Sequence, residues 1–142
     1  MRLSWIVPAL LALVAALLMA ADLSQAEARK LANPVLFTKM SIDQGHVTFK
    51  QNCTGCHGEN GKAEKAIIAA ATDLTSPKLY KNGTTDGEIY RTIRDGAGDQ
   101  MPPFKYQGLT DTEIWQLVAY IHSLWPEGSR PQLLPDEKKK RM

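Results

Sequence analysis

The chain has only two cysteines, Cys53 and Cys56, and they are too close together to link distant segments. They lie in QNCTGCHGENGK, residues 51–62, with His57 directly behind them. A single core of about 85 residues buries a modest share of its surface and is marginally stable by itself. Small secreted domains often compensate with several disulfides, which this chain does not have. We therefore expect another group to fill and hold the interior.

The first residues have the layout of a secretory signal peptide. Arg2 is followed by the apolar run WIVPALLALVAALLMAA, residues 5–21, and the small residues Ser24 and Ala26 suit a cut after Ala26. The run is at the lower limit of the about 17–25 residues that span a bilayer, so an uncleaved membrane anchor is the alternative. We expect residues 1–26 to be one or the other, and both place the body of the chain outside the cytoplasm, in the periplasm or its equivalent.

The remaining sequence divides into three parts. Residues 27–40 have a mixed composition and predict a tether, and residues 41–125 predict the folded core. Residues 126–142 contain three prolines, end in the basic cluster KKKR and predict a solvated tail that could also dock an acidic partner. The net charge of +2 is small, and no basic stripe runs along the body, which excludes a nucleic-acid binder.

The core predicts helices joined by loops. Three Ser or Thr residues are followed three positions later by Gln or Glu, the pattern of a capping box at a helix start. The pairs are Ser41 with Gln44, Thr85 with Glu88, and Thr110 with Glu113. No segment shows the strict alternation of a half-buried strand. The predicted fold is small and all-α.

The sequence of Cys53, Thr54, Gly55, Cys56 and His57 fits the C-x-x-C-H pattern of covalent haem attachment. Two thiols at this spacing reach the two vinyl groups of a porphyrin, and the adjacent histidine is carried under the iron. A zinc site needs more ligands than the chain offers at paired spacing, and a thioredoxin-like redox pair needs a βαβ pattern that is absent. A plain disulfide stays open as an alternative.

With this motif, residues 41–125 resemble the class I c-type cytochromes. GHVTF, residues 45–49, is similar to the glycine and aromatic by which the family's N-terminal helix crosses the C-terminal one. GDQMPPF, residues 98–104, resembles the loop that carries the second axial ligand, and IWQLVAYIHSL resembles the closing helix. The resemblance implies two crossing terminal helices, with loops and a middle helix wrapped around one covalently attached haem c.

One departure from the family concerns the proline whose carbonyl often accepts the imidazole N–H of the haem histidine. The first proline after His57 is Pro77, so the carbonyl that orients His57 stays open.

Met101 is the candidate for the sixth iron ligand. Pro102 favours an extended backbone at Met101, and neither Pro102 nor Pro103 has an N–H that would tie the loop into regular structure. Met40 is expected to be a packing residue, while Met1, Met19 and Met142 lie in the leader and tail. His46 and His122 are expected to be surface or partly buried histidines. Phe104, Tyr80, Tyr90 and Trp115 are either haem contacts or ordinary core aromatics.

The resemblance implies an electron-transfer protein with His57 and Met101 as axial ligands and no catalytic residues of its own. Its partners would be a dehydrogenase or quinol-oxidising complex as donor and a terminal oxidase or reductase as acceptor. A fixed cytochrome subunit of a larger membrane-associated redox enzyme is the alternative. A haem-based ligand sensor or peroxidase-like protein is a third hypothesis, and it requires an open sixth position.

Overall fold

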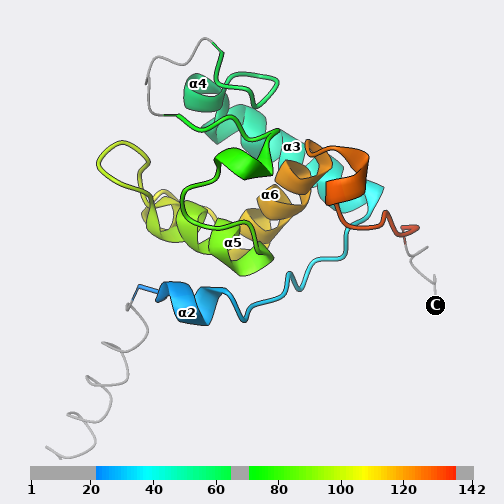
Figure 1. Ribbon diagram of the computed structural model, residues 1–142, viewed down its shortest axis with the longest axis horizontal. Helices are drawn as coiled ribbons and strands as arrows, with labels where there is room; N and C mark the ends of the chain where they lie inside the picture. The colour runs from blue at the N-terminus through cyan, green and yellow to red at the C-terminus, as the bar shows by residue number, and fades with distance from the viewer. Residues whose placement is uncertain (1–21, 65–70, 137–142) are drawn as a thin grey trace, which may run out of the picture.

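The computed structural model describes residues 22–64 and 71–136 (Figure 1). Within these ranges the chain forms helices and isolated bridges but no β-strand, which confirms the all-α prediction. The α-helices are α2 (Gln25–Ala28), α3 (Lys39–Asn52), α4 (Thr54–His57), α5 (Asp86–Asp95) and α6 (Asp111–Ser123). Short 3-10 turns are η1 (Pro77–Leu79), η2 (Phe104–Tyr106) and η3 (Glu127–Ser129). The apolar run of residues 5–21 and the basic cluster of residues 138–141 lie outside the described ranges.

Two of the three predicted helix starts are confirmed. Thr85 caps α5 with Glu88, and Thr110 caps α6 with Glu113, each as a complete capping box. The predicted start of α3 was wrong. The N-cap is Thr38 rather than Ser41, and Ser41 is its capping-box partner at the third helical position. The Thr38 N–H donates to Ser41 Oγ at 3.1 Å, and the Ser41 N–H donates to Thr38 Oγ1 at 3.2 Å. A serine hydroxyl therefore replaces the usual carboxylate or amide at that position.

Helices α3 and α6 cross at a close contact that glycine makes possible (Figure 1). A Cβ on Gly45 would lie 2.1 Å from the carbonyl oxygen of Gln116 in α6. Phe49, one turn further along α3, is fully buried and packs against Tyr120. The structure thus assigns to GHVTF the crossing role that the resemblance implied.

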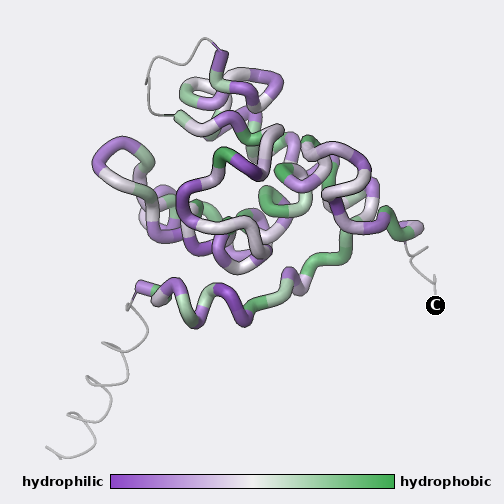
Figure 2. Tube along the Cα trace, in the orientation of Figure 1, coloured by the Kyte–Doolittle hydropathy of each residue, from purple (hydrophilic) through white to green (hydrophobic). Residues whose placement is uncertain are grey.

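The hydrophobic core collects the apolar faces of α3, α5 and α6. Figure 2 shows the apolar residues gathered on α6 at the centre and in the chain just before α3. The fully buried side chains Ile114, Leu117 and Val118 all come from α6. This helix forms one wall of the site described below.

Residues 22–38, here called the N-terminal strap, run along α5 before they reach α3 (Figure 1). Helix α2 of the strap approaches α5 so closely that a Cβ on Gly87 would lie 1.9 Å from the carbonyl oxygen of Ala28. The Asn33 side chain donates to the carbonyl oxygen of Trp115 in α6 at 3.0 Å. The segment from which the sequence predicted a tether, residues 27–40, thus contacts the core at several points, although most of its residues are exposed.

The start of the predicted tail pairs with the end of the strap. The Leu134 N–H donates to the Phe37 carbonyl oxygen at 2.9 Å, and the Met40 N–H donates to Asp136 Oδ1 at 2.9 Å. Residues 134–136 are therefore tied to the beginning of α3, while residues 126–136 as a whole stay exposed. None of the helices in residues 22–64 and 71–136 is both long and apolar enough to cross a membrane.

Candidate functional site

A cavity of about 610 Å³ brings together the four site residues predicted from sequence. Cys53, Cys56, His57 and Met101 all line it. The first three come from the junction of α3 and α4, and Met101 comes from the loop after α5, more than forty residues later. A volume of this size is in the range of cofactor and small-molecule sites, which is about 300–1,000 Å³.

The rest of the cavity wall is largely apolar. Helices α3, α5 and α6 contribute Phe49, Ile89, Ile93, Leu117 and Ile121. Phe104 and Tyr80 also line the cavity, whereas Tyr90 and Trp115 do not. Those two rings stack on each other with centroids 3.9 Å apart, so they are ordinary core aromatics. An apolar wall suits the faces of a porphyrin and excludes water from its centre.

The two cysteines are presented by a tight turn between helices. Cys53 ends α3, and its carbonyl oxygen accepts hydrogen bonds from the N–H groups of Cys56 and His57, at 3.2 and 2.9 Å. The turn closes at Gly58, whose φ of 72° favours glycine. This geometry turns both thiols and the imidazole toward one cavity.

The environment of the Cys53 thiol does not suit the nucleophile of a redox pair. Burial, with a smaller effect from the neighbouring Cys56, raises the pKa of the Cys53 thiol to about 12. Reactive C-x-x-C cysteines instead have a lowered pKa, because the thiolate is the nucleophile. A zinc site fares no better, since no three His, Cys, Asp or Glu side chains cluster as metal ligands anywhere in the described part of the chain.

The orientation of His57 comes from a residue that the sequence did not identify. His57 Nδ1 lies 3.0 Å from the carbonyl oxygen of Thr72. An Nδ1–H that donates to this carbonyl leaves Nε2 unprotonated and able to bind a metal ion. Burial also lowers the pKa of His57, with partial opposition from the Thr72 hydrogen bond, which favours the neutral imidazole that metal binding requires.

The Met101 loop is closed by backbone contacts. The Ala97 N–H donates to the Met101 carbonyl oxygen at 3.0 Å, and the Met101 N–H donates back to Ala97 at 3.3 Å. Gly96 begins the loop with a φ of 82°, and a Cβ there would lie 2.6 Å from the Met101 carbonyl oxygen. The loop therefore has a defined shape, with the half-buried Met101 facing the cavity.

The other two histidines do not line the cavity. His46 is exposed and stacks on Tyr120, with ring centroids 4.9 Å apart. His122 is buried more deeply than the sequence predicted, with 4% of its surface exposed. Its Nδ1 lies 3.4 Å from Asp86 Oδ1, and burial lowers its pKa while the Asp86 charge opposes that effect. His122 is buried because it lies between α5 and Trp125. The apolar stripe of α6 alone does not indicate this position.

The sequence did not indicate which contacts hold residues 74–80, which include the lining residues Leu74 and Tyr80, at the cavity. The Leu74 carbonyl oxygen accepts hydrogen bonds from Tyr80 OH at 2.8 Å and from Trp125 Nε1 at 3.1 Å. Burial raises the pKa of Tyr80 to about 12, so its hydroxyl stays a donor. These bonds fix residues 74–80 against the end of α6. The signal in the sequence was the pair of aromatics with polar tips, Tyr80 and Trp125.

Comparison with known families gives a match over most of the core. Residues 41–121 match the family model described as cytochrome c oxidase, cbb3-type, subunit III. The cbb3-type oxidase subunit CcoP of Helicobacter pylori is 34% identical over 69% of this chain and 31% of its own. The subunit FixP of Sinorhizobium medicae is 32% identical over 76% of this chain and 38% of its own. The chain thus spans about a third of the length of these relatives.

Other similar proteins carry different names. Cytochrome c-L of Methylorubrum extorquens is 32% identical over 72% of this chain and 50% of its own. The crystal structure of cytochrome cL from Methylophaga aminisulfidivorans superposes with a TM-score of 0.53 and 27% identity, covering 61% of this chain and 55% of that one. A chain of the reducing HAO-like protein complex of Kuenenia stuttgartiensis gives a TM-score of 0.57 and 26% identity, over 66% and 47%.

Proposed function

Because the chain belongs to the c-type cytochrome family described as cytochrome c oxidase, cbb3-type, subunit III, we propose that it transfers single electrons through one covalently bound haem c. The observation that carries this proposal is the convergence of two thiols, an imidazole and a thioether on one apolar cavity. These are the groups that attach and ligate a haem in cytochromes c. The family implies haem c, and the assignment of its ligands to these residues is part of the proposal.

Each of the four residues has a distinct part. Cys53 and Cys56 would hold the porphyrin by thioether bonds, and His57, oriented by the Thr72 carbonyl, would bind iron through Nε2. Met101 would bind from the opposite face. When bound, the haem supplies an iron that alternates between its ferrous and ferric states. With both His57 and Met101 as iron ligands, no coordination site would be left for a substrate, which fits an electron carrier.

The apolar walls serve the same purpose. Phe49, Leu117 and Ile121 present apolar side chains to the cavity, so little solvent would have to reorganise when the charge on a bound haem iron changes. Soft thioether ligation by Met101 would favour the ferrous state and raise the reduction potential. The fold would thus supply a largely apolar environment for the haem, and that environment would tune the reduction potential.

A redox titration combined with carbon monoxide exposure tests this function. We expect one reversible one-electron transition and no carbon monoxide binding to the native reduced protein. Rapid carbon monoxide binding would contradict the electron-carrier proposal, because it requires an open or labile sixth position. It would favour the ligand-sensor or peroxidase-like alternative.

The comparisons favour a place in a larger redox enzyme as the second candidate. The matched relatives CcoP and FixP are named as subunits of cbb3-type oxidases, and this chain corresponds to about a third of each. We extend the proposal to an exported domain that receives electrons from a dehydrogenase or quinol-oxidising complex and passes them to a terminal oxidase or reductase. Solubilisation of membranes followed by purification through a tag on this chain tests the subunit role. Co-purification of a stoichiometric membrane enzyme would support it, and recovery of the chain alone would favour a free carrier.

A further inference from the structure

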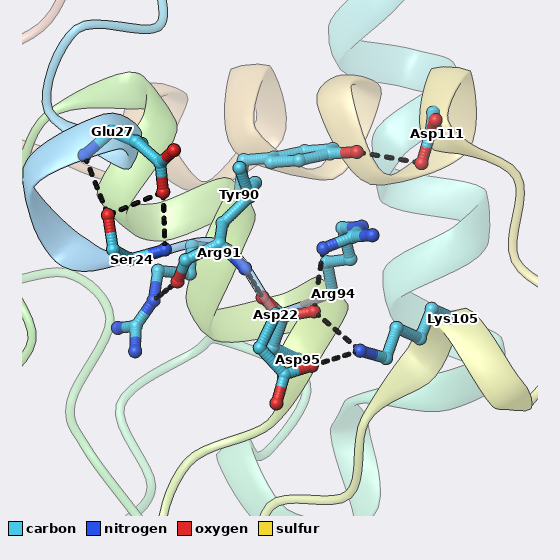
Figure 3. Close-up of polar contacts among 10 residues, drawn as sticks. Asp22, Ser24, Glu27, Tyr90, Arg91, Arg94, Asp95, Lys105 and Asp111 are labelled. Atoms are coloured by element: carbon cyan, nitrogen blue, oxygen red, sulfur yellow. Dashed lines mark hydrogen bonds and ion pairs between the residues drawn. The ribbon is translucent and has the colours of Figure 1, made fainter. Parts of the chain in front are cut away.

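The first residues of the N-terminal strap meet the base of the Met101 loop in a cluster of charges (Figure 3). The Lys105 ammonium lies between two carboxylates, those of Asp22 and Asp95 (Figure 3). It is 3.0 Å from Asp95 Oδ1 and also contacts Asp22 Oδ1. Both acidic partners raise the pKa of Lys105, and Lys105 lowers the pKa of Asp22. Lys105 and Asp22 are therefore charged throughout the neutral range.

The centre of this cluster is buried and depends on the strap for a donor. The side chains of Asp95 and Lys105 are 6% and 14% exposed. Asp95 Oδ1 accepts from Arg94 Nη1 at 2.8 Å and from Lys105, and Asp95 Oδ2 accepts from the backbone N–H of Leu23 at 3.1 Å. A buried carboxylate is costly unless donors surround it. Without residue 23, Asp95 Oδ2 loses the protein donor it has here.

The strap is held at the same point from a second side. Arg91 Nε donates to the carbonyl oxygen of Leu23, so both backbone groups of this residue are bound by α5. Asp22 itself is 72% exposed, and its own ion pair is a surface contact of small energy. The backbone of Leu23, rather than the Asp22 charge, is therefore the larger part of the contact.

The cluster closes the loop that carries Met101. Asp95 is the last residue of α5, and Lys105 lies in η2, so their ion pair joins the two ends of residues 96–104. Inside this closure, Ala97 and Met101 are paired by two backbone hydrogen bonds. A loop that is closed both by this ion pair and by these backbone hydrogen bonds has fewer conformations in which Met101 leaves the cavity.

We propose that Leu23 and Asp22 complete a clamp, formed with Asp95 and Lys105, that holds the Met101 loop in the position for iron ligation. Lys105 and Asp95 are positioning residues that act through Met101. The strap adds the Leu23 N–H as a donor to Asp95 and the Asp22 carboxylate as a partner for Lys105. The proposal rests on the proposed function for its effect on the iron. Its effect on the loop stands by itself.

The clamp has a consequence for processing of the leader. The cut after Ala26 suggested by the sequence would remove Asp22, Leu23 and Ser24, and with them the donor to Asp95 and the N-cap of α2. The clamp therefore requires a chain that keeps residue 22 and everything after it. A cut upstream of Asp22 and an uncleaved anchor both satisfy this requirement.

The test uses full-length haem-bound protein exported by a host able to attach haem, with three variants. Lys105→Met removes the charge and keeps the length, Lys105→Arg restores the charge, and Lys39→Met is the matched control. Lys39 pairs with Asp43 on the surface of α3, away from the loop. Asp22→Asn is a fourth, milder variant at an exposed position that keeps the proposal testable if Lys105→Met does not fold.

Two readouts are measured, and they separate the clamp from the function. The first is hydrogen exchange of the Ala97 and Met101 amides, which we expect to be about tenfold faster or more in Lys105→Met, faster to a smaller degree in Asp22→Asn, and unchanged in Lys39→Met. The second is the long-wavelength Met–iron absorption band of the oxidised protein, which should weaken in Lys105→Met, with carbon monoxide binding on reduction. Lys105→Arg should return both readouts toward those of the wild type.

The proposal is overturned if Lys105→Met exchanges these amides no faster than Lys39→Met. If the wild-type protein lacks the Met–iron band, the Met101 assignment fails, and amide exchange alone decides the clamp. Intact-mass measurement of the exported protein adds an independent check. A first residue at Asp22 or earlier supports the clamp, and a mature chain that begins at Glu27 overturns it.

Discussion

His57 and Thr72 are joined by a contact of 3.0 Å between the imidazole Nδ1 and the backbone carbonyl oxygen. The acceptor lies fifteen positions beyond the histidine and is the carbonyl of a threonine, not of the proline that often has this role in the family that the sequence resembles. A carbonyl in this position raises the basicity of the imidazole and fixes its rotation. With His57 as the proposed iron ligand, this bond would connect the loop after residue 70 to the properties of the haem.

A first prediction follows for the proton on His57. In the reduced, haem-bound protein the Nδ1–H should exchange slowly with solvent, because it is half-buried and donated to Thr72. Nitrogen-15 NMR of the imidazole measures this proton directly. Fast exchange, or a protonated Nε2, would contradict the orientation seen here.

The assignment of Met101 predicts a change in two properties of the iron. Met101→Ala should lower the reduction potential and allow carbon monoxide to bind the reduced protein, because a soft axial ligand is lost. Met40→Ala is the matched control, since Met40 is 54% exposed and does not line the cavity. A potential in Met101→Ala equal to that of the control would rule out the axial role.

The crossing of α3 and α6 predicts a strong dependence on Gly45. Gly45→Ala should lower the free energy of unfolding by about 1–3 kcal/mol, because the new Cβ meets the rigid backbone of Gln116. Gly128→Ala is the control, as a Cβ there meets no atom within 4 Å. Denaturant unfolding of the two haem-bound variants measures the difference. Equal stability would show that the helices can separate without cost.

The contacts of Glu88 predict that the stability of the fold depends on pH. Its side chain is buried, which alone would raise its pKa, but hydrogen bonds from Arg29, Thr85 and Gln25 lower the pKa to about 2 from 4.5. A carboxyl whose folded pKa is lowered stabilises the fold above its unfolded pKa. This contribution should be lost as the pH falls from about 4.5 to about 2.

Thermal unfolding at several pH values tests the role of Glu88. Glu88→Gln should flatten the dependence in this range by removing the titrating group. Glu113→Gln, at the equivalent capping position of α6 but more exposed, should remove a smaller part of it. A Glu88→Gln profile parallel to that of the wild type would show that the Arg29 pair contributes nothing.

The parts of the fold predicted from sequence depend on local patterns. Thr85 with Glu88 and Thr110 with Glu113 mark helix starts because the capping contacts span only three residues. The start of α3 was predicted wrongly because serine and threonine can both cap a helix. The pattern indicated Ser41 as the N-cap, whereas Thr38, three residues earlier, has that role. The cavity was anticipated because its four key residues lie in two short motifs.

The parts that were missed depend on contacts between distant residues. The packing of α2 on α5 requires Gly87, but a glycine inside a capping box does not by itself indicate which backbone approaches it. Thr72 supplies a carbonyl, and every residue has one, so its side chain carried no signal. The burial of His122 likewise depends on contacts outside α6, with Asp86 in α5 and with Trp125 after the end of α6.

Absorption spectroscopy before and after acid–acetone extraction is the most direct test of covalent haem attachment. We expect a haem that stays with the protein, through bonds to Cys53 and Cys56, and a Met–iron band at long wavelength in the oxidised form. A double variant, Cys53→Ser with Cys56→Ser, should lose the covalent haem. A haem that extracts fully from the wild type, or no haem in protein from a host able to attach it, would contradict covalent attachment through Cys53 and Cys56.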